Sequence, residues 1–257
     1  MSKQHKRSPQ GWDSLAAWYD GWMGQHGSRH HRQLALPAVL DLLQPDTDEA
    51  ILDVGAGQGV LAPSIAACGA RYTGIEISPR LIGRARQRHG QHGTFLRGDA
   101  RRLHTISKLA PESFDGVVFL LSIQDMNPLE EVLRSAAWAL RAGGRLVILM
   151  THPCFRIPRQ SGWGRDPQRK LLYRRVDCYL TPLQVPLKPY GKQQRGISIS
   201  FHRPLNQYIN TLGKCGLLVD QLDEISGQEI DGSKAENRAA REFPLFLGIR
   251  ARKFAVL

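Results

Sequence analysis

Short apolar runs alternate with longer amphipathic stretches along much of the chain. The apolar runs predict buried strands, and stretches in which every third or fourth position is apolar predict helices. The predicted strands are Ala50–Val54, Arg71–Ile77, Thr94–Leu96, Phe114–Leu121 and Arg145–Met150. The predicted helices are Trp12–Met23, Leu34–Leu43, Val60–Cys68, one that opens at Ser78-Pro79, and Leu129–Leu140, with Gly143-Gly144 as the turn into the fifth strand. This alternation predicts an α/β fold with a Rossmann-like, doubly wound and mostly parallel sheet, preceded by N-terminal helices.

The alternation of strands and helices stops after Met150. The segment 152–196 is rich in Pro, Gly and Arg and has no clear period, so we interpret it as an inserted, substrate-side lid after the fifth strand. Beyond it we predict a strand at Ile197–Phe201, a helix at Leu205–Lys214 ended by Gly216, and strands at Leu217–Leu222 and Pro244–Lys253. The expected organisation is a basic flexible tail, 1–11, followed by a single domain, 12–257.

A glycine turn after the first predicted strand carries the strongest chemical signal. The segment Leu52–Gly59 reads Leu-Asp-Val-Gly-Ala-Gly-Gln-Gly. Glycines permit a tight turn and the close approach of a ligand, which the N–H groups of the next helix then face. The spacing differs from the G-x-G-x-x-G of dinucleotide enzymes. Asp53 suits the cationic end of a ligand and would repel a pyrophosphate; the alternative is a plain strand-to-helix turn.

Two more acidic residues follow the next predicted strands. Glu76 ends the second strand roughly 20 residues after the glycines, where a carboxylate can accept hydrogen bonds from both hydroxyls of a ribose. Asp99 follows the third strand and can accept from the amine of adenine, or it can cap the helix that starts near Arg101. Both acids lie at the carboxyl edge of the expected sheet, where ligands bind in such folds.

Together these motifs resemble the class I methyltransferases that depend on S-adenosylmethionine (SAM), in particular the small-molecule group called methyltransferase type 11. The resemblance rests on Leu52–Gly59, Gly74–Ser78, Gly98–Ala100, Phe114–Met126 and Leu140–Leu149. Ala17–Asp20 is similar to the N-terminal tyrosine–aspartate helix of the family. Phe201–Leu205, Tyr208 and Gly216-Leu217 are similar to the strand–helix–strand that closes its sheet.

This resemblance implies SAM as cofactor and in-line methyl transfer to an O, N or C nucleophile of a small molecule. It implies that the cofactor is bound by Tyr19, Asp53, Gly55, Ala56, Gly57, Gly59, Glu76, Ile77, Asp99, Ala100 and Ser122. Asp53 and the glycines would hold the methionine portion, Glu76 the ribose and Asp99 the adenine. Ile77 would pack on the adenine face, Ser122 would lie below the sulfonium and Tyr19 would cover the cofactor.

Three residues are candidates for catalysis. His152 follows the fifth predicted strand and His202 follows a later one, and histidine titrates near neutrality, so either is a candidate general base. The alternative for each is a hydrogen-bonded structural histidine. Asp125, with its neighbour Gln124, is a candidate for orienting the acceptor after the fourth strand. Cys154 is interpreted as a small buried residue rather than a nucleophile, because no Pro-Cys pair follows the fourth strand.

The net charge of +12 leaves the partner open. Several arginines lie in the insertion among aromatic residues such as Trp163, Tyr173 and Tyr190, a mixture that suits an acidic aromatic metabolite or stacked single-stranded bases. An RNA methyltransferase is therefore the alternative to a small-molecule enzyme, favoured by charge but not by motif. A nicotinamide oxidoreductase and a non-catalytic SAM-binding protein are less favoured. We expect a small acidic or aromatic acceptor.

Cysteine usage and hydropathy indicate the setting of the protein. The four cysteines (Cys68, Cys154, Cys178 and Cys215) are far apart and form no C-x-x-C pair, so neither a zinc site nor a disulfide framework is predicted, and we expect no metal. No apolar run reaches the roughly 18–20 residues that span a bilayer, and the N-terminus lacks the apolar core of a secretory signal. A reduced, cytoplasmic protein is expected; the oligomeric state is not predicted.

Overall fold

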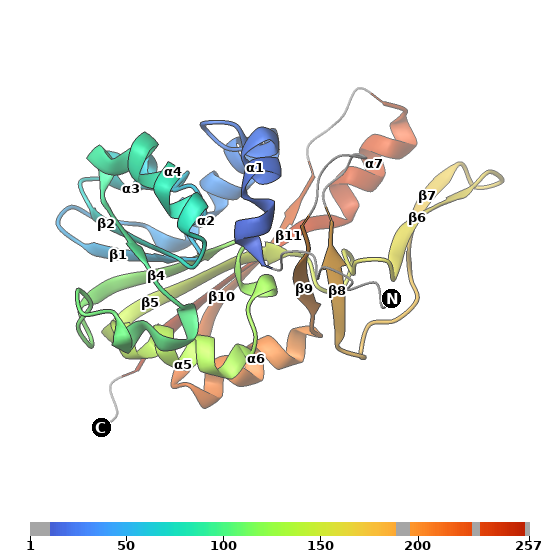
Figure 1. Cartoon of the computed structure of the whole chain (residues 1–257). Helices are drawn as coiled ribbons and strands as arrows, with labels where there is room; N and C mark the ends of the chain where they lie inside the picture. The colour runs from blue at the N-terminus through green and yellow to red at the C-terminus, as the bar shows by residue number, and fades with distance from the viewer. Residues whose placement is uncertain (1–10, 189–195, 228–231, 255–257) are drawn as a thin grey trace, which may run out of the picture.

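A seven-stranded sheet lies at the centre of the computed structural model, which describes residues 11–188, 196–227 and 232–254 (Figure 1). The order of its strands is β10-β11-β5-β4-β1-β2-β3. The parallel strands are β1 (Ala50–Val54), β2 (Arg71–Glu76), β3 (Thr94–Arg97), β4 (Phe114–Leu120) and β5 (Leu140–Thr151). β11 (Pro244–Lys253) runs antiparallel to β5, and β10 (Leu217–Ser226) antiparallel to β11. The predicted doubly wound, mostly parallel sheet is confirmed, and its order reverses between β1 and β4.

Helices cover both faces of this sheet. The helices α2 (Leu36–Leu43), α3 (Ala62–Ala67) and α4 (Pro79–His89) lie on one face, and α5 (Leu129–Ala139) and α6 (Leu205–Lys214) on the other (Figure 1). α1 (Trp12–Met23) lies against α4, and α7 (Lys234–Glu242) contacts β7 and β10. Shorter helical turns are His31–Ala35, Gly90–His92, Ala100–Thr105 and Ile123–Asp125.

The two faces of the sheet have separate apolar cores. Leu52 of β1 and Phe119 of β4 belong to the core beneath α5 and α6, whereas Ile51 and Val118 belong to the core beneath α2 and α3. All four side chains are fully buried. A strand that is buried on both faces needs apolar residues at consecutive positions, which is why the central strands read as continuous apolar runs in the sequence.

The predicted elements of the sheet are confirmed, with differences at their ends. Ser78 caps α4 as expected, because its hydroxyl accepts from the Leu81 amide and Pro79 occupies the first turn. β5 begins at Leu140 rather than at Arg145, since Leu140 already pairs with Phe114. The expected turn at Gly143 lies inside β5, in a register irregularity where the glycine has a φ of 74°.

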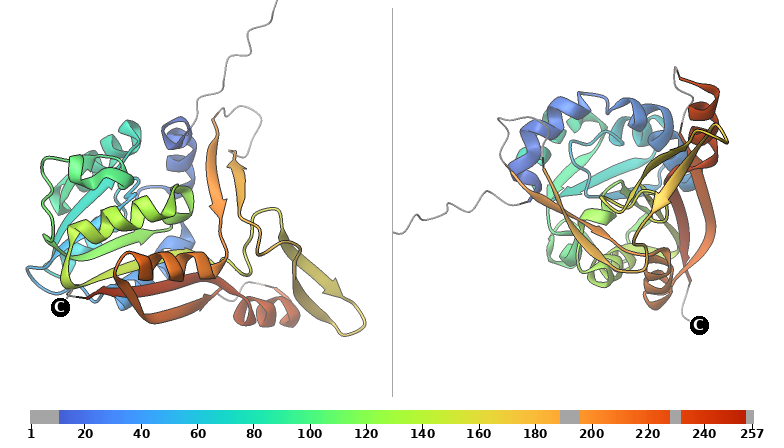
Figure 2. Two further views of the ribbon diagram at one scale, coloured as in Figure 1. Left: turned by 90° about the horizontal axis from the view of Figure 1, so that it is seen from below. Right: turned by 90° about the vertical axis from the view of Figure 1, so that its right-hand side faces the viewer.

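The segment 152–196 contains strands that the sequence did not predict, in β6 (Ser161–Asp166), β7 (Leu171–Val176) and β8 (Leu183–Leu187). β6 and β7 form an antiparallel hairpin that projects from the body of the molecule (Figures 1 and 2). Its turn is stabilised by Asp166, whose Oδ1 accepts from the Arg169 amide at 3.0 Å. Cross-strand pairing therefore overrides the weak strand propensity of Gly and Pro in this segment. Residues 189–195 of the expected insertion, like residues 1–10 of the expected tail, lie outside the described residues.

The strand–helix–strand expected to close the sheet is divided between two sheets. β9 (Ser198–His202) pairs with β8 in a separate two-stranded sheet, whereas β10 joins the main sheet. The expectation that β9 closes the main sheet was wrong, because β8 supplies its hydrogen-bonding partners, with Leu183 opposite His202. β9 instead contacts α1 and the turn Ile123–Asp125. α7 was not predicted.

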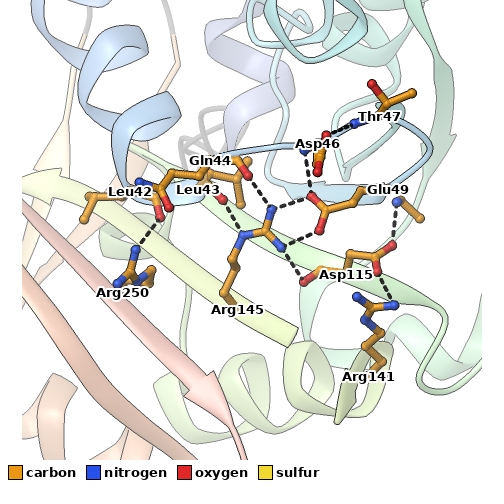
Figure 3. A network of polar contacts seen from close by, with 11 residues as sticks. Leu42, Leu43, Gln44, Asp46, Thr47, Glu49, Asp115, Arg141, Arg145 and Arg250 are labelled. Atoms are coloured by element: carbon orange, nitrogen blue, oxygen red, sulfur yellow. Dashed lines mark hydrogen bonds and ion pairs between the residues drawn. The ribbon is translucent and has the colours of Figure 1, made fainter. Parts of the chain in front are cut away.

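A buried arginine holds the amino-terminal side of the sheet together (Figure 3). Arg145 is 9% exposed, and its guanidinium donates to the carbonyls of Leu43 and Gln44 and to both carboxylate oxygens of Glu49. The same guanidinium holds the pKa of Glu49 below its usual value. One side chain of β5 thereby fixes both the end of α2 and the loop that leads into β1.

We expect Arg145→Met to lower the free energy of unfolding by roughly 2–4 kcal/mol, because Glu49 loses its partner and buried carbonyls lose their donor. The contribution of Glu49 is present at neutral pH and is lost as pH falls through its lowered pKa, so the deficit should shrink in acid. Urea unfolding measures both effects. Arg134→Met, which breaks an exposed pair with Glu130 on α5, is the control and should cost less than about 1 kcal/mol. Equal losses in the two variants would contradict the assignment.

Candidate functional site

A cavity of about 610 Å³ opens where the carboxyl ends of the parallel strands meet. Its walls come from α1, the glycine turn, the segments that follow β2, β3 and β4, and parts of the segment 152–196, β9 and β11. Its volume lies in the range of pockets that hold a cofactor-sized ligand. The predicted cofactor residues that line it are Tyr19, Gly55, Gly57, Glu76, Ile77, Asp99, Ala100 and Ser122. Asp53, Ala56 and Gly59 are not among its lining residues.

The glycines of the turn serve different purposes. Gly55, Gly57 and Gly59 all have positive φ angles, of 79°, 56° and 81°. A Cβ at Gly59 would lie 2.6 Å from the Phe95 ring, so this glycine is required by packing inside the protein. A Cβ at Gly57 would meet only the Tyr19 ring, at 3.7 Å. Gly57 therefore leaves the floor of the cavity open beneath Tyr19.

Glu76 bridges the glycine turn and the start of α4. Its side chain is 6% exposed; Oε2 accepts from the Gly57 amide at 3.0 Å and Oε1 from the Ser78 amide at 2.8 Å. Burial raises the pKa of Glu76, and these amide donors oppose the rise. Each carboxylate oxygen has a second acceptor position, so Glu76 can accept further hydrogen bonds from a ligand in the cavity.

Asp53 lies beneath the glycine turn. It is 2% exposed, and its Oδ2 accepts from the Tyr72 hydroxyl at 2.7 Å. Burial raises the pKa of Asp53 to about 7, a rise that the Tyr72 bond opposes and the charge of Glu76 reinforces. Its Oδ1 is buried with no hydrogen-bond partner among the described residues. Asp53 is therefore suited to act on a ligand through its charge rather than by forming the cavity wall.

The adenine-side candidates lie along the loops after β2 and β3. Asp99 caps the turn Ala100–Thr105: its Oδ1 accepts from the Arg101 amide at 3.0 Å, and its carboxylate pairs with the Arg101 guanidinium at 2.6 Å. The capping role considered from the sequence is thus present, and adenine recognition stays a prediction. Ile77, an apolar side chain, is 54% exposed on the cavity wall. Ser122 donates to the Val54 carbonyl at 2.7 Å.

Ion pairs hold α1 over the cavity. Asp13 accepts from the Ser78 hydroxyl at 2.7 Å and from the Arg80 amide at 3.0 Å. Asp20 pairs with Arg84 at 3.2 Å and with Arg88 at 2.5 Å. These contacts place three aromatic side chains on the cavity wall, those of Trp12, Tyr19 and Trp22. Burial raises the pKa of Tyr19, so its hydroxyl stays protonated.

Comparisons with known proteins agree with this geometry. Residues 52–148 match a family described as a methyltransferase domain. The fold matches an S-adenosylmethionine-dependent methyltransferase from Mesorhizobium loti with a TM-score of 0.65 and 25% identity, over 89% of this chain and 100% of that one. A methyltransferase from Listeria monocytogenes shares the fold with a TM-score of 0.66 at 22% identity, over 85% of this chain and 98% of that one.

Residues 52–148 thus match the methyltransferase domain family, and the chain as a whole has the fold of SAM-dependent methyltransferases. Curated relatives are a ubiquinone biosynthesis O-methyltransferase from Xylella fastidiosa, 27% identical over 58% of this chain and 61% of the relative, and a demethylmenaquinone methyltransferase from Tropheryma whipplei, 33% identical over 45% of this chain and 48% of the relative. The chain thus spans about half to three fifths of the length of these relatives.

Neither candidate histidine is among the residues that line the 610 Å³ cavity. His152 is 1% exposed; its Nε2 lies 2.8 Å from Oε1 of Glu224, and its Nδ1 accepts from the Cys154 amide at 3.2 Å. Burial lowers the pKa of His152. The Nε2 atom of His202 donates to the Tyr179 carbonyl at 2.7 Å. Both rings thus have the contacts of structural histidines, and a role as general base remains an untested prediction.

Asp125 is the candidate catalytic residue that lines the cavity. Its Oδ1 is buried with no hydrogen-bond partner among the described residues, and the same holds for Oε1 of Gln124. The Gln124 amide is oriented by its Nε2, which donates to the Leu121 carbonyl at 3.0 Å. Two neighbouring residues of the cavity wall therefore each carry a buried acceptor atom that has no partner among the described residues.

Sequence reasoning did not identify several other residues of the cavity wall. It includes Trp12, Trp22, His31, Ser200 and Phe246. The helical spacing of Trp12, Tyr19 and Trp22 was a usable signal for the tryptophans, since it places them toward one side of α1. Ser200 and Phe246 come from strands far along the chain, and no local pattern relates them to the glycine turn.

The described part of the chain was searched for clusters of metal-binding side chains and for helices that could span a membrane. No three His, Cys, Asp or Glu side chains gather there in a way that would hold a metal ion. None of the helices described is long and apolar enough to cross a membrane. The four cysteines are all free thiols. Cys154 is only partly buried, so the expectation of a buried residue was wrong.

Asp53→Asn should alter how stability depends on pH. The folded-state pKa of Asp53 is raised to about 7, so its contribution is fully present below the unfolded pKa and is lost as pH rises through about 7. The stability of the wild type relative to Asp53→Asn should therefore fall over that range, by roughly 1.4 kcal/mol per unit of pKa difference. Thermal unfolding between pH 4.5 and 8 (roughly the range in which Asp53 titrates) measures this. Asp41→Asn, at an exposed site on α2, is the control and should show the same dependence of stability on pH as the wild type. The same dependence in Asp53→Asn as in the wild type would contradict the raised pKa of Asp53.

Proposed function

We propose that this protein transfers the methyl group of SAM to a nucleophile of a small molecule. The observation that carries the proposal is one cavity that combines the open glycine turn and buried Glu76 on one side with an aromatic wall and a partnerless carboxylate oxygen on the other. SAM supplies an activated methyl group on a positively charged sulfur when bound. The protein then has to orient the acceptor and exclude water.

The residues of the cavity fit this cofactor chemically. The spare acceptor positions of Glu76 suit the ribose hydroxyls, and the exposed apolar side chain of Ile77 suits an adenine face. Gly57 leaves space beneath Tyr19, and the buried charge of Asp53 suits a cationic ligand. We propose that Asp99 accepts a hydrogen bond from the adenine amine. Its capping of the turn Ala100–Thr105 is compatible with this role, because a carboxylate can accept several hydrogen bonds.

A small acceptor is favoured over RNA by the arginines of the insertion. Of Arg156, Arg159, Arg165 and Arg169, only Arg156 lines the cavity. Its guanidinium donates to the carbonyls of Phe243 and Pro244, both at 3.2 Å, and burial lowers its pKa to about 10. Arg101 also lines the cavity but pairs with Asp99, so Arg156 is the cation left for one acidic group on an acceptor rather than for a nucleic-acid backbone. The name of one curated relative, a ubiquinone biosynthesis enzyme, also favours a small acceptor.

We further propose that residues 12–257 act as one catalytic domain, with the segment 152–196 on the substrate side. Its support is that Arg156, Pro158 and Leu187 line the same cavity as the glycine turn. A cytoplasmic location is proposed because free thiols fit a reducing compartment.

Glu76→Ala should weaken the binding of SAM and S-adenosylhomocysteine alike, by roughly 10- to 100-fold, because both share the ribose and lose a charged acceptor. Isothermal titration calorimetry measures both affinities. Glu131→Gln, an exposed site on α5, is the matched control and should bind like the wild type. Absence of SAM binding by the wild-type protein at millimolar ligand would end the proposal.

The acceptor class is tested by incubating a cell extract with the protein and methyl-labelled SAM, with and without nuclease. Label in a small compound that is insensitive to nuclease is the expected result. Label in nuclease-sensitive polymer would instead make this an RNA methyltransferase.

A further inference from the structure

Asp125 lies at the junction between the cofactor side of the cavity and the wall formed by α1 and β9. It ends the short turn Ile123–Asp125 that follows β4, and β9 packs against this turn. A buried carboxylate oxygen without a hydrogen-bond partner is costly and uncommon in folded proteins. Oδ1 of Asp125 is such an atom among the described residues, and the residue lines a cavity large enough for a ligand. A ligand with an O–H or N–H group would satisfy it.

The surroundings of Asp125 keep its carboxyl poised between its two protonation states. Burial raises its pKa to about 7, whereas the side chains of Ser200 and Trp12 and the positive charge of Arg203 oppose the rise. The hydroxyl groups of Tyr19 and Tyr208 interact electrostatically with the same carboxyl. Burial raises the pKa of both tyrosines, so they stay neutral.

Arg203 does not neutralise the carboxyl outright. Its guanidinium donates to the Met126 carbonyl at 2.6 Å and to Oδ1 of Asn127 at 3.0 Å. Asp125 can therefore both hold a negative charge and take up a proton near neutral pH.

A row of rings begins beside Asp125 and continues along the cavity wall. The ring centres of Trp12 and Tyr19 are 5.2 Å apart, those of Tyr19 and Trp22 are 6.0 Å apart, and those of Trp22 and His31 are 6.0 Å apart. All four side chains line the cavity. Burial lowers the pKa of His31 to about 4, so its ring is uncharged at neutral pH. Such a wall favours a flat aromatic ligand.

Charge distinguishes an aromatic hydroxyl from a cationic amine as that ligand. Aromatic rings with a nearby carboxylate also suit an ammonium group. However, Arg156 lines the same cavity, and its guanidinium donates to the carbonyls of Phe243 and Pro244 rather than to an acid. This positive charge favours a neutral or acidic aromatic ring as the acceptor.

We propose that the methyl acceptor is an aromatic hydroxyl compound and that Asp125 is the catalytic base that binds its hydroxyl group through Oδ1. This proposal rests on the proposed methyl transfer. In the step, the acceptor oxygen forms a bond to the methyl carbon while the bond between that carbon and the cofactor sulfur breaks. The hydroxyl proton passes to Oδ1 of Asp125, and neutral S-adenosylhomocysteine leaves. Gln124, whose Oε1 also lacks a partner, is a positioning residue for a second donor on the acceptor.

The test compares phenol with anisole, which has the same ring but no hydroxyl proton. Both are titrated at pH 8 (about one unit above the pKa of Asp125) into protein saturated with S-adenosylhomocysteine, and binding is followed by NMR. The wild type should prefer phenol by about tenfold, the scale of one hydrogen bond to a charged group. The preference should fall in the wild type as pH is lowered through about 7, where Asp125 takes up a proton.

Asp125→Asn should lose the preference, because an amide can turn its N–H donors toward the cavity. Asp115→Asn makes the same change at a buried carboxyl at the opposite end of β4, away from the cavity, and should retain the preference. The pH titration of the wild type tests the same group even if a variant folds poorly. The affinity of each variant for S-adenosylhomocysteine is measured first, so a failure of cofactor binding is recognised as a failure of the proposed function.

Two results would overturn the inference while leaving the proposed function intact. One is cofactor binding with no preference for phenol, or a preference that Asp125→Asn and low pH leave unchanged. The other is a preference for benzylamine over phenol that depends on Asp125, which would make the site a cage for an ammonium acceptor.

Discussion

The buried carboxylate of Glu76 joins the parts of the molecule on which the site depends. Its two oxygens accept hydrogen bonds from the amides of Gly57 and Ser78, so one side chain holds the glycine turn against the start of α4. Ser78 in turn donates its hydroxyl to Asp13, which anchors α1. The position of Tyr19 above Gly57 therefore follows from a carboxylate at the end of β2. A substitution at Glu76 should therefore disturb both the glycine turn and the position of α1.

Negative charge is concentrated at the carboxyl ends of the strands in a protein that is basic overall. Burial raises the pKa values of Asp53, Glu76 and Asp125, and the charge of Glu76 adds to the rise at Asp53. Keeping such groups buried costs stability above neutral pH, which is common where a site is shaped for a ligand rather than for the fold. A positively charged ligand would lower these pKa values and recover part of that stability, as the proposed cofactor does by its sulfonium.

The sequence could predict that the residues proposed to bind the cofactor lie together, because they follow successive strands whose carboxyl ends meet. The order of the parallel strands is enough to bring Gly55, Glu76 and Asp99 into the wall of one cavity. The histidine predictions did not have this support. Thr151 lines the cavity whereas His152, the next residue, does not, because successive side chains of an extended strand point to opposite sides. A strand end located to within one residue therefore does not tell which side chain faces the ligand.

The opposite wall of the cavity was beyond local patterns because it is assembled from segments far apart in the sequence. Trp12 comes from α1, Ser200 from β9 and Phe246 from β11. Their positions depend on contacts that no spacing reveals: the anchoring of α1 by its acids, the pairing of β9 with β8, and the pairing of β11 with β5. All three lie outside residues 52–148, the part that matches the methyltransferase domain family. The half of the cavity that the family shares is thus built from one continuous stretch of chain, and the half that would select the acceptor is added around it. Side chains of the second half can change without disturbing the hydrogen bonds between Glu76 and the amides of Gly57 and Ser78. A change of acceptor therefore need not weaken the binding of the proposed cofactor.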